Sequence, residues 1–258
     1  MLDWVYEVDL WVLGLATIVL IAGAAKLGAW IGSRAHRRGR ADTDLGTVTG
    51  AALGLLALLI GFSFSLALSR HDARRLLVIE EANVIGSTAN FALMLPEAAQ
   101  RPILEALRAY ASVRLAFGVP FAAARLERDV ARSLELQATL WQQAVAVSAA
   151  APRSLVVYRF VGSLNEMNNI HERRLTGLRY HVPPVIMMML VAVAMVAMGF
   201  TGLQIGYATG TMRPIAMLLM SMTLALVITL IADLDRPTRG LIHVPLQPLQ
   251  DALSSLPG

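Results

Sequence analysis

The feature that most constrains this chain is an uncharged stretch of 23 residues, 46–68, which ends abruptly at a basic cluster. As an α-helix the stretch spans about 34 Å, which is enough to cross the hydrocarbon core of a bilayer. Eleven of its residues are Val, Leu, Ile or Phe, and each of these favours membrane insertion by about 0.3–0.6 kcal/mol. The stretch therefore predicts a transmembrane helix.

The same stretch carries a stripe of small residues along one side of the predicted helix. They recur at every third or fourth position: Gly46, Gly50, Gly54, Ala57, Gly61 and Ser65. Small residues at this spacing let two helix backbones approach closely. Two interpretations stay open. The stripe is either an ordinary packing face inside the membrane, or a face that packs against copies of the same helix around an axis and lines a pore.

Composition and three further apolar segments indicate a membrane protein with several spans. The mean hydropathy is +0.59 and 56% of the residues are apolar, which is typical of a membrane protein. Further spans are predicted at 10–32, 182–205 and 214–234, the last two beginning at prolines. The acidic N-terminus lacks the basic region and small-residue cleavage site of a signal peptide, so the first span is expected to remain as an anchor.

A long polar region separates the second and third predicted spans. Breakers at Pro96, 118–120 and Pro152 divide it into helical stretches at 70–95, 97–117, 121–149 and 154–180. The stretch at 97–117 sets apolar residues against Arg101, Arg108 and Arg114, and the stretch at 121–149 places Leu126, Val130, Leu134, Trp141 and Val145 at near-helical spacing. We therefore expect an all-α protein. Its predicted parts are two spans (1–68), a helical cytoplasmic domain (69–181), two more spans (182–234) and a cytoplasmic tail (235–258).

The orientation prediction rests on counting basic residues near the ends of the spans. With the N-terminus outside, the cytoplasmic side holds five Arg residues: four in the 33–45 linker, and Arg213. With the N-terminus inside, it holds eight, beginning with Arg70, Arg74 and Arg75. We therefore expect both termini in the cytoplasm.

Several kinds of chemistry find no support in the sequence. No pair of histidines has metal-ligand spacing, there is no cysteine, no phosphate-binding loop occurs, and no basic patch interleaved with aromatic residues indicates nucleic-acid binding. We expect neither an enzyme nor a bound cofactor. Glu80 and Glu81 lie on the predicted exposed extension of the second span and are interpreted as a solvated face or as partners in interdomain ion pairs. Asp233 and Asp235 are expected to cap the fourth span or to pair with Arg236 and Arg239.

The uncharged helix offers the elements of a pore. Gly54, Leu58 and Phe62 lie on one side of it, and a ring of such residues forms a hydrophobic constriction that gates by dewetting. Arg70, Arg74 and Arg75 follow, and repeated around an axis they would concentrate anions. Anchoring of the helix at the lipid headgroups explains these arginines equally well.

At these residues the chain resembles the bestrophins. GFSFSLALSRHDARR (61–75) is similar to their second helix, in which a Gly-Phe pair precedes an Arg and then an Ala/Gly-Arg. SLNEMNNIHERRLTGLRYHVPP (163–184) resembles the charged helix and prolines before their third span. LVITLIADLDRPTRGL (226–241) and VPLQPLQDAL (244–253) resemble the end of their core, and the resemblance extends over about 47–253. The chain is most similar to bacterial proteins of a bestrophin-like domain family.

This resemblance implies a homo-oligomer, pentameric in bestrophins, with one anion-conducting axial pore lined by the second helix. The hydrophobic neck of that family carries over to Phe62, Leu58 and Gly54, of which Gly54 departs from the bulky residue expected. Animal bestrophins bind calcium through an acidic cluster after the last span, whereas this tail offers only Asp251 after the proline. Calcium needs six to eight oxygen ligands, so no metal is expected.

We therefore expect a four-span protein of the bacterial inner membrane whose partners are its own copies, the lipid bilayer and small anions. A helix-packing role falls to Gly46, Gly50, Gly61 and Ser65. The alternative is an oligomeric membrane-anchored structural or sensory protein that does not conduct.

Overall fold

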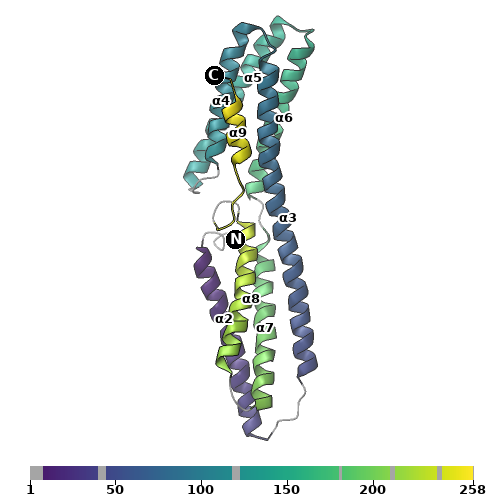
Figure 1. Ribbon diagram of the computed structural model, residues 1–258, viewed down its shortest axis with the longest axis vertical. Helices are drawn as coiled ribbons and strands as arrows, with labels where there is room; N and C mark the ends of the chain where they lie inside the picture. The colour runs from purple at the N-terminus through teal and green to yellow at the C-terminus, as the bar shows by residue number, and fades with distance from the viewer. Residues whose placement is uncertain are drawn as a thin grey trace. The chain divides into compact units, whose positions relative to one another are not determined.

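The computed structural model describes residues 8–39, 45–117, 123–179, 182–209, 213–236 and 240–257. Within these ranges the regular structure is entirely helical (Figure 1). The helices are α2 (Leu10–Arg37), α3 (Gly46–Ala92), α4 (Glu97–Ala116), α5 (Ala123–Ala150), α6 (Leu155–Arg179), α7 (Pro184–Thr209), α8 (Pro214–Asp235) and α9 (Gln247–Ser255). The prediction of an all-α protein is confirmed.

In the described part of the chain, α2, α3, α7 and α8 are long and apolar enough to cross a membrane. They are the four helices that the apolar segments predicted. The chain divides into two compact units, and α3 contributes to both: its residues up to Arg70 belong to the first unit and those from His71 onward to the second.

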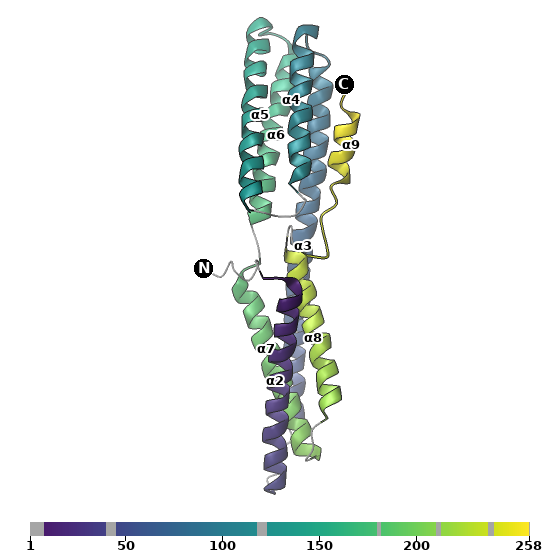
Figure 2. The ribbon, with the colours of Figure 1, turned by 90° about the vertical axis from the view of Figure 1, so that its left-hand side faces the viewer.

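The first unit contains α2, the first half of α3, α7 and α8. Its core is made of apolar side chains from all four helices, among them Ile21, Leu56, Met198 and Ile228. In both ribbon views α2 lies beside α7 and α8 (Figures 1 and 2). Burial of these side chains on one side of each helix leaves large apolar residues on the other sides, as expected for helices that face lipid or another chain.

The closest approach of two helices in this unit is between α2 and α7, and glycines make it possible. A Cβ atom placed on Gly28 would overlap the carbonyl oxygen of Gly199, and one placed on Gly202 would overlap that of Ala25. Gly32 and Gly206 face Leu203 and Ala29 in the same way one turn further along. The two backbones are therefore in direct contact, which is how small residues join membrane helices. This kind of contact was predicted for α3 and not for α2 and α7.

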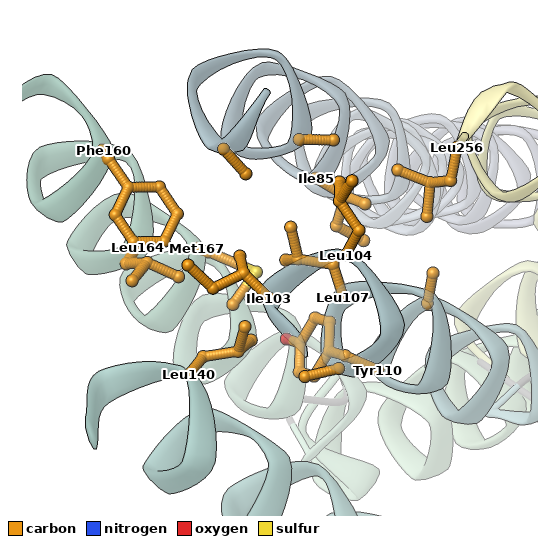
Figure 3. Close-up of a cluster of buried hydrophobic side chains, with 14 of the residues drawn as sticks. Ile85, Ile103, Leu104, Leu107, Tyr110, Leu140, Phe160, Leu164, Met167 and Leu256 are labelled. Atoms are coloured by element: carbon orange, nitrogen blue, oxygen red, sulfur yellow. The ribbon is translucent and has the colours of Figure 1, made fainter. Parts of the chain in front are cut away.

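The second unit contains the rest of α3 together with α4, α5, α6 and α9. Figure 3 shows its core, in which Ile85 of α3, Leu107 of α4, Leu140 of α5 and Leu164 of α6 point toward one another. These residues recur on one face of each helix, so a bundle forms around a single apolar interior.

The face of α5 that is buried differs from the one that the spacing suggested. Its buried apolar residues are Leu136, Leu140, Ala144 and Val147. Leu134, Trp141 and Val145, which the sequence analysis grouped as an apolar face, are exposed. The helix therefore has two apolar stripes, and only one of them packs into the bundle.

The C-terminal tail is partly helical, which the sequence analysis did not predict. α9 follows Pro245 and packs against α4, with Leu249 and Leu256 buried in the core of the bundle. Arg108 of α4 donates a hydrogen bond from Nη2 to the carbonyl oxygen of Leu256 over 2.7 Å. The tail is thus part of the second unit.

Candidate functional site

The part of α3 that belongs to the first unit has one side which no other described residue covers. Leu58 and Phe62 are 55% and 66% exposed on this side. A Cβ atom placed on Gly50, Gly54 or Gly61 would meet no other described atom within 4 Å. We call this surface the open face of α3.

The open face has two flanks of different character. Each residue of an α-helix advances by about 100°, so Gly50, Ala57 and Gly61 fall on one flank, with Gly54 and Ser65 nearer the middle. Larger apolar residues fall on the other flank: Leu55, Phe62 and Leu66, with Leu58 between the two. The residues predicted for a seam and those predicted for a constriction thus share one surface. Gly46 lies outside it and is only partly exposed.

The three arginines that follow do not lie on one side of α3. Arg75 is exposed, Arg70 is partly exposed and Arg74 is buried within the second unit. The Cγ atom of Arg74 is 3.9 Å from the position of a Cβ on Gly177 of α6. Two helical turns separate Arg74 from Glu81, so both side chains point to the same buried side of α3. Arg74, one of the three arginines predicted to form a basic ring, therefore points into the bundle.

A cluster of charged side chains lies inside the second unit, and we call it the Glu81 cluster. Glu81 of α3 is 0% exposed. Arg114 of α4 donates a hydrogen bond from Nε to Glu81 Oε1 over 2.5 Å. Arg174 of α6 donates one from Nη1 to Glu81 Oε2. The two guanidinium groups thus each occupy one oxygen of the same carboxylate.

This cluster corrects two sequence-based expectations. The prediction of a solvated face is wrong for Glu81, which is buried and makes ion pairs. Its neighbour Glu80 forms an exposed ion pair with Arg173 at 3.1 Å. Arg114 was expected on the polar side of its helix, but it is also 0% exposed. The 3.6-residue period of α4 places Arg114 on the side of Tyr110 and Leu107, and the carboxylate of Glu81 makes its burial possible.

Two neutral groups complete the Glu81 cluster. Tyr110 Oη lies 3.3 Å from His171 Nδ1 and 3.4 Å from Gln137 Nε2. Burial, followed by the nearby charge of Arg114, lowers the pKa of His171 to about 4. Burial also raises the pKa of Tyr110 well above its usual value. At neutral pH the cluster therefore contains two positive groups and one negative group.

Asp233 and Asp235, at the end of α8, bind backbone groups. Asp233 accepts hydrogen bonds from the N–H groups of Leu241 at 2.8 Å and Ile242 at 3.1 Å. Asp235 accepts one from the N–H of Val182, just before α7, at 2.8 Å. These bonds add a role that was not predicted, since the two carboxylates hold neighbouring chain segments in place; the predicted caps and ion pairs stay a prediction. Arg239 lies outside the described residues.

The described residues contain no group of three or more His, Cys, Asp or Glu side chains that could hold a metal ion.

Four membrane-length helices are combined with a helical bundle to which α3 and the C-terminal tail contribute. This fold defines a class of membrane protein. The family model for the bestrophin-like domain matches residues 19–249. The chain belongs to the bestrophin-like domain family.

Solved structures have the same fold. A bacterial bestrophin homologue from Klebsiella pneumoniae superposes with a TM-score of 0.71 at 14% sequence identity, covering 94% of this chain and 99% of the other. A single-residue variant of that homologue gives a TM-score of 0.72 at 14% identity, with 94% and 97% covered. A crystal structure described only as that of a membrane protein gives 0.70 at 15% identity, with 96% and 97% covered. No curated protein sequence matches the chain.

Proposed function

We propose that the chain is the subunit of a homo-oligomeric membrane channel that conducts small anions through an axial pore lined by α3. The observation that carries the proposal is the open face of α3. Its seam of small residues and its large apolar residues are both left uncovered by the described part of the chain. Membership of the bestrophin-like domain family supports a channel-type protein.

The contact between α2 and α7 supports the reading of the seam as a contact surface. There, glycines at small-residue spacing bring two backbones together. Gly50, Gly54 and Gly61 have similar spacing but meet no partner among the described residues. A helix from another copy of the chain would complete the same kind of contact.

A second uncovered apolar surface lies on α5, in the second unit. Leu134, Trp141 and Val145 are exposed there, on a helix with many charged residues that has no membrane-spanning character. Exposed apolar patches of this kind mark contact sites for proteins or membranes, and we assign this one to a neighbouring subunit. Head-to-tail contacts between identical subunits form a ring when the rotation between neighbours closes, and five is the subunit number that the resemblance to bestrophins implies.

In this assembly Leu58 and Phe62 narrow the pore and Gly54 leaves a wider ring above them. Apolar rings of this kind control conduction by dewetting. Arg75 and Arg70 lie beyond the constriction and raise the local concentration of anions, while the buried Arg74 adds to the field without lining the pore. We place the protein in the bacterial inner membrane with both termini in the cytoplasm.

The experiment is anion flux into liposomes that contain the purified protein. Phe62→Ala should increase flux because it removes the most exposed large side chain of the constriction. Phe64→Ala is the matched control, since Phe64 is two residues away and packs against the core of the first unit. Its substitution should lower stability without increasing flux per inserted protein.

Two results would contradict the proposal. A monomer in native mass measurements would remove the axial pore. An oligomer without flux, for the wild type and for Phe62→Ala in every ion gradient, would favour the non-conducting structural or sensory protein.

Orientation has its own test, because the chain has no native cysteine. Arg38→Cys, at the exposed end of α2, should react with an impermeant thiol reagent only from the periplasmic side. Ser255→Cys, at the end of α9, should react only after the membrane is opened. The reverse pattern would place the termini outside.

A further inference from the structure

The Glu81 cluster has an excess of positive charge that its own members do not neutralise. Both oxygens of Glu81 are occupied, one by Arg114 and the other by Arg174. Tyr110 and His171 are neutral at pH 7, so they add no negative charge. One net positive charge remains inside the bundle.

The uncompensated donors are on Arg114. Its Nε is bonded to Glu81, but Nη1 and Nη2 are buried and have no hydrogen-bond acceptor among the described residues. The face of the guanidinium lies over the ring of Phe117, 4.0 Å from its centroid. The ring covers the face of the guanidinium, so Nη1 and Nη2 at the end of the side chain are the groups that remain available to a ligand.

Burial makes these free donors significant. Buried polar groups in native proteins are almost always hydrogen-bonded, and an unsatisfied one indicates a water or an ion. A water molecule satisfies a donor but leaves the charge, whereas a buried charge requires a counter-charge to be tolerated. The end of a guanidinium presents parallel N–H groups in a fixed fork, a geometry that matches an anion.

We propose that Arg114 holds a small monovalent anion, such as chloride, inside the helical bundle through Nη1 and Nη2. The anion brings the charge of the Glu81 cluster to zero. His171 Nε2 is another buried nitrogen of the cluster without a partner among the described residues, and it becomes a second donor in the tautomer in which Nδ1 accepts from Tyr110. The site is separate from the open face of α3, so the proposal does not rest on conduction.

The test uses the full-length protein in detergent, purified without chloride in sodium gluconate. Gluconate is then replaced by chloride at constant ionic strength while the midpoint of thermal unfolding is measured. The midpoint should rise with saturation, by about 5–10 °C when chloride reaches a hundred times its dissociation constant. Arg114→Gln should abolish the chloride-dependent rise.

Arg132→Gln is the matched control. Arg132 belongs to the same bundle, on α5, but it makes an exposed ion pair with Glu135. This variant should keep the full response to chloride. A response retained by Arg114→Gln, lost equally in both variants, or missing from the wild type would overturn the proposal.

A second measurement does not depend on the folding of a variant. Wild-type crystals grown in bromide should show an anomalous peak within hydrogen-bonding distance of Arg114 Nη1 and Nη2. A well-defined map without a peak at Arg114 would overturn the proposal even if Arg114→Gln fails to fold.

Discussion

Substitution of Glu81 by glutamine should destabilise the second unit strongly, because it removes the only negatively charged side chain of the Glu81 cluster. The change keeps the size of the side chain and one carbonyl oxygen. It leaves Arg114 and Arg174 close together and buried, and it places an amide N–H₂ against one of them. The effect is therefore one of charge and hydrogen bonding, without a cavity.

The magnitude of this destabilisation follows from the burial of the ion pairs that Glu81 makes. Removing one member of a buried ion pair typically costs about 3–5 kcal/mol, since the partner is left charged and unpaired. At about 2–4 °C per kcal/mol for a protein of roughly this chain's length, the midpoint of thermal unfolding should fall by roughly 6–20 °C.

Glu80→Gln is the control, one residue away on the same helix. The side chains of Glu80 and Arg173 are 44% and 56% exposed, and exposed pairs contribute about 0–1 kcal/mol. The midpoint should therefore fall by less than about 4 °C. The assay is thermal unfolding in detergent, followed by circular dichroism. If both substitutions lower the midpoint equally, the interior of the bundle does not depend on Glu81 and the reasoning is refuted.

Two further predictions concern other parts of the molecule. Gly202→Ala forces α2 and α7 apart and should lower the free energy of unfolding by about 1–3 kcal/mol. Gly23→Ala is the control: a Cβ there meets no described atom within 4 Å, so the change should be neutral or stabilising by up to about 1 kcal/mol. Equal stability of the two variants would contradict the backbone contact. His171 titrates in the unfolded chain near pH 6.5 and in the folded protein at about 4, so its contribution is present above pH 6.5 and is lost as the pH falls. Between pH 6.5 and 5 stability should fall with a slope that rises from about 0.7 to at most about 1.4 kcal/mol per pH unit. His171→Gln should remove this part of the slope, as urea unfolding at each pH would show.

Much of the fold could be predicted because hydrophobic length and breakers are local properties. The spans are read from long apolar runs, and Pro96 separates α3 from α4 where the sequence indicated. The resemblance to bestrophins was confirmed by the family model. α9 was missed because it is short and its helical character depends on docking of Leu249 into a core that the tail sequence does not reveal.

The parts of the candidate site that involve pairs of helices were harder to predict. Glycines occur on α2, α3 and α7, and nothing in the sequence shows that those of α2 and α7 face each other while those of α3 remain open. Arg114 was placed on a polar face because arginine is usually exposed. Its burial depends on Glu81, which is 33 residues away in the chain, so only tertiary structure reveals the pair. Signals were nonetheless present, since Tyr110 and Leu107 lie on the same side of that helix as Arg114.

The contact between α2 and α7 also has a consequence for the order of events during synthesis. About 150 residues separate the end of α2 from the start of α7. At roughly 5–20 residues per second, the ribosome needs roughly 7–30 s to cover that distance. Throughout this time α2 is in place while its glycine face has no partner, because the helix that covers it has not yet been made. Completion of the first unit is therefore a late step, and a chain truncated before α7 leaves α2 without its principal neighbour.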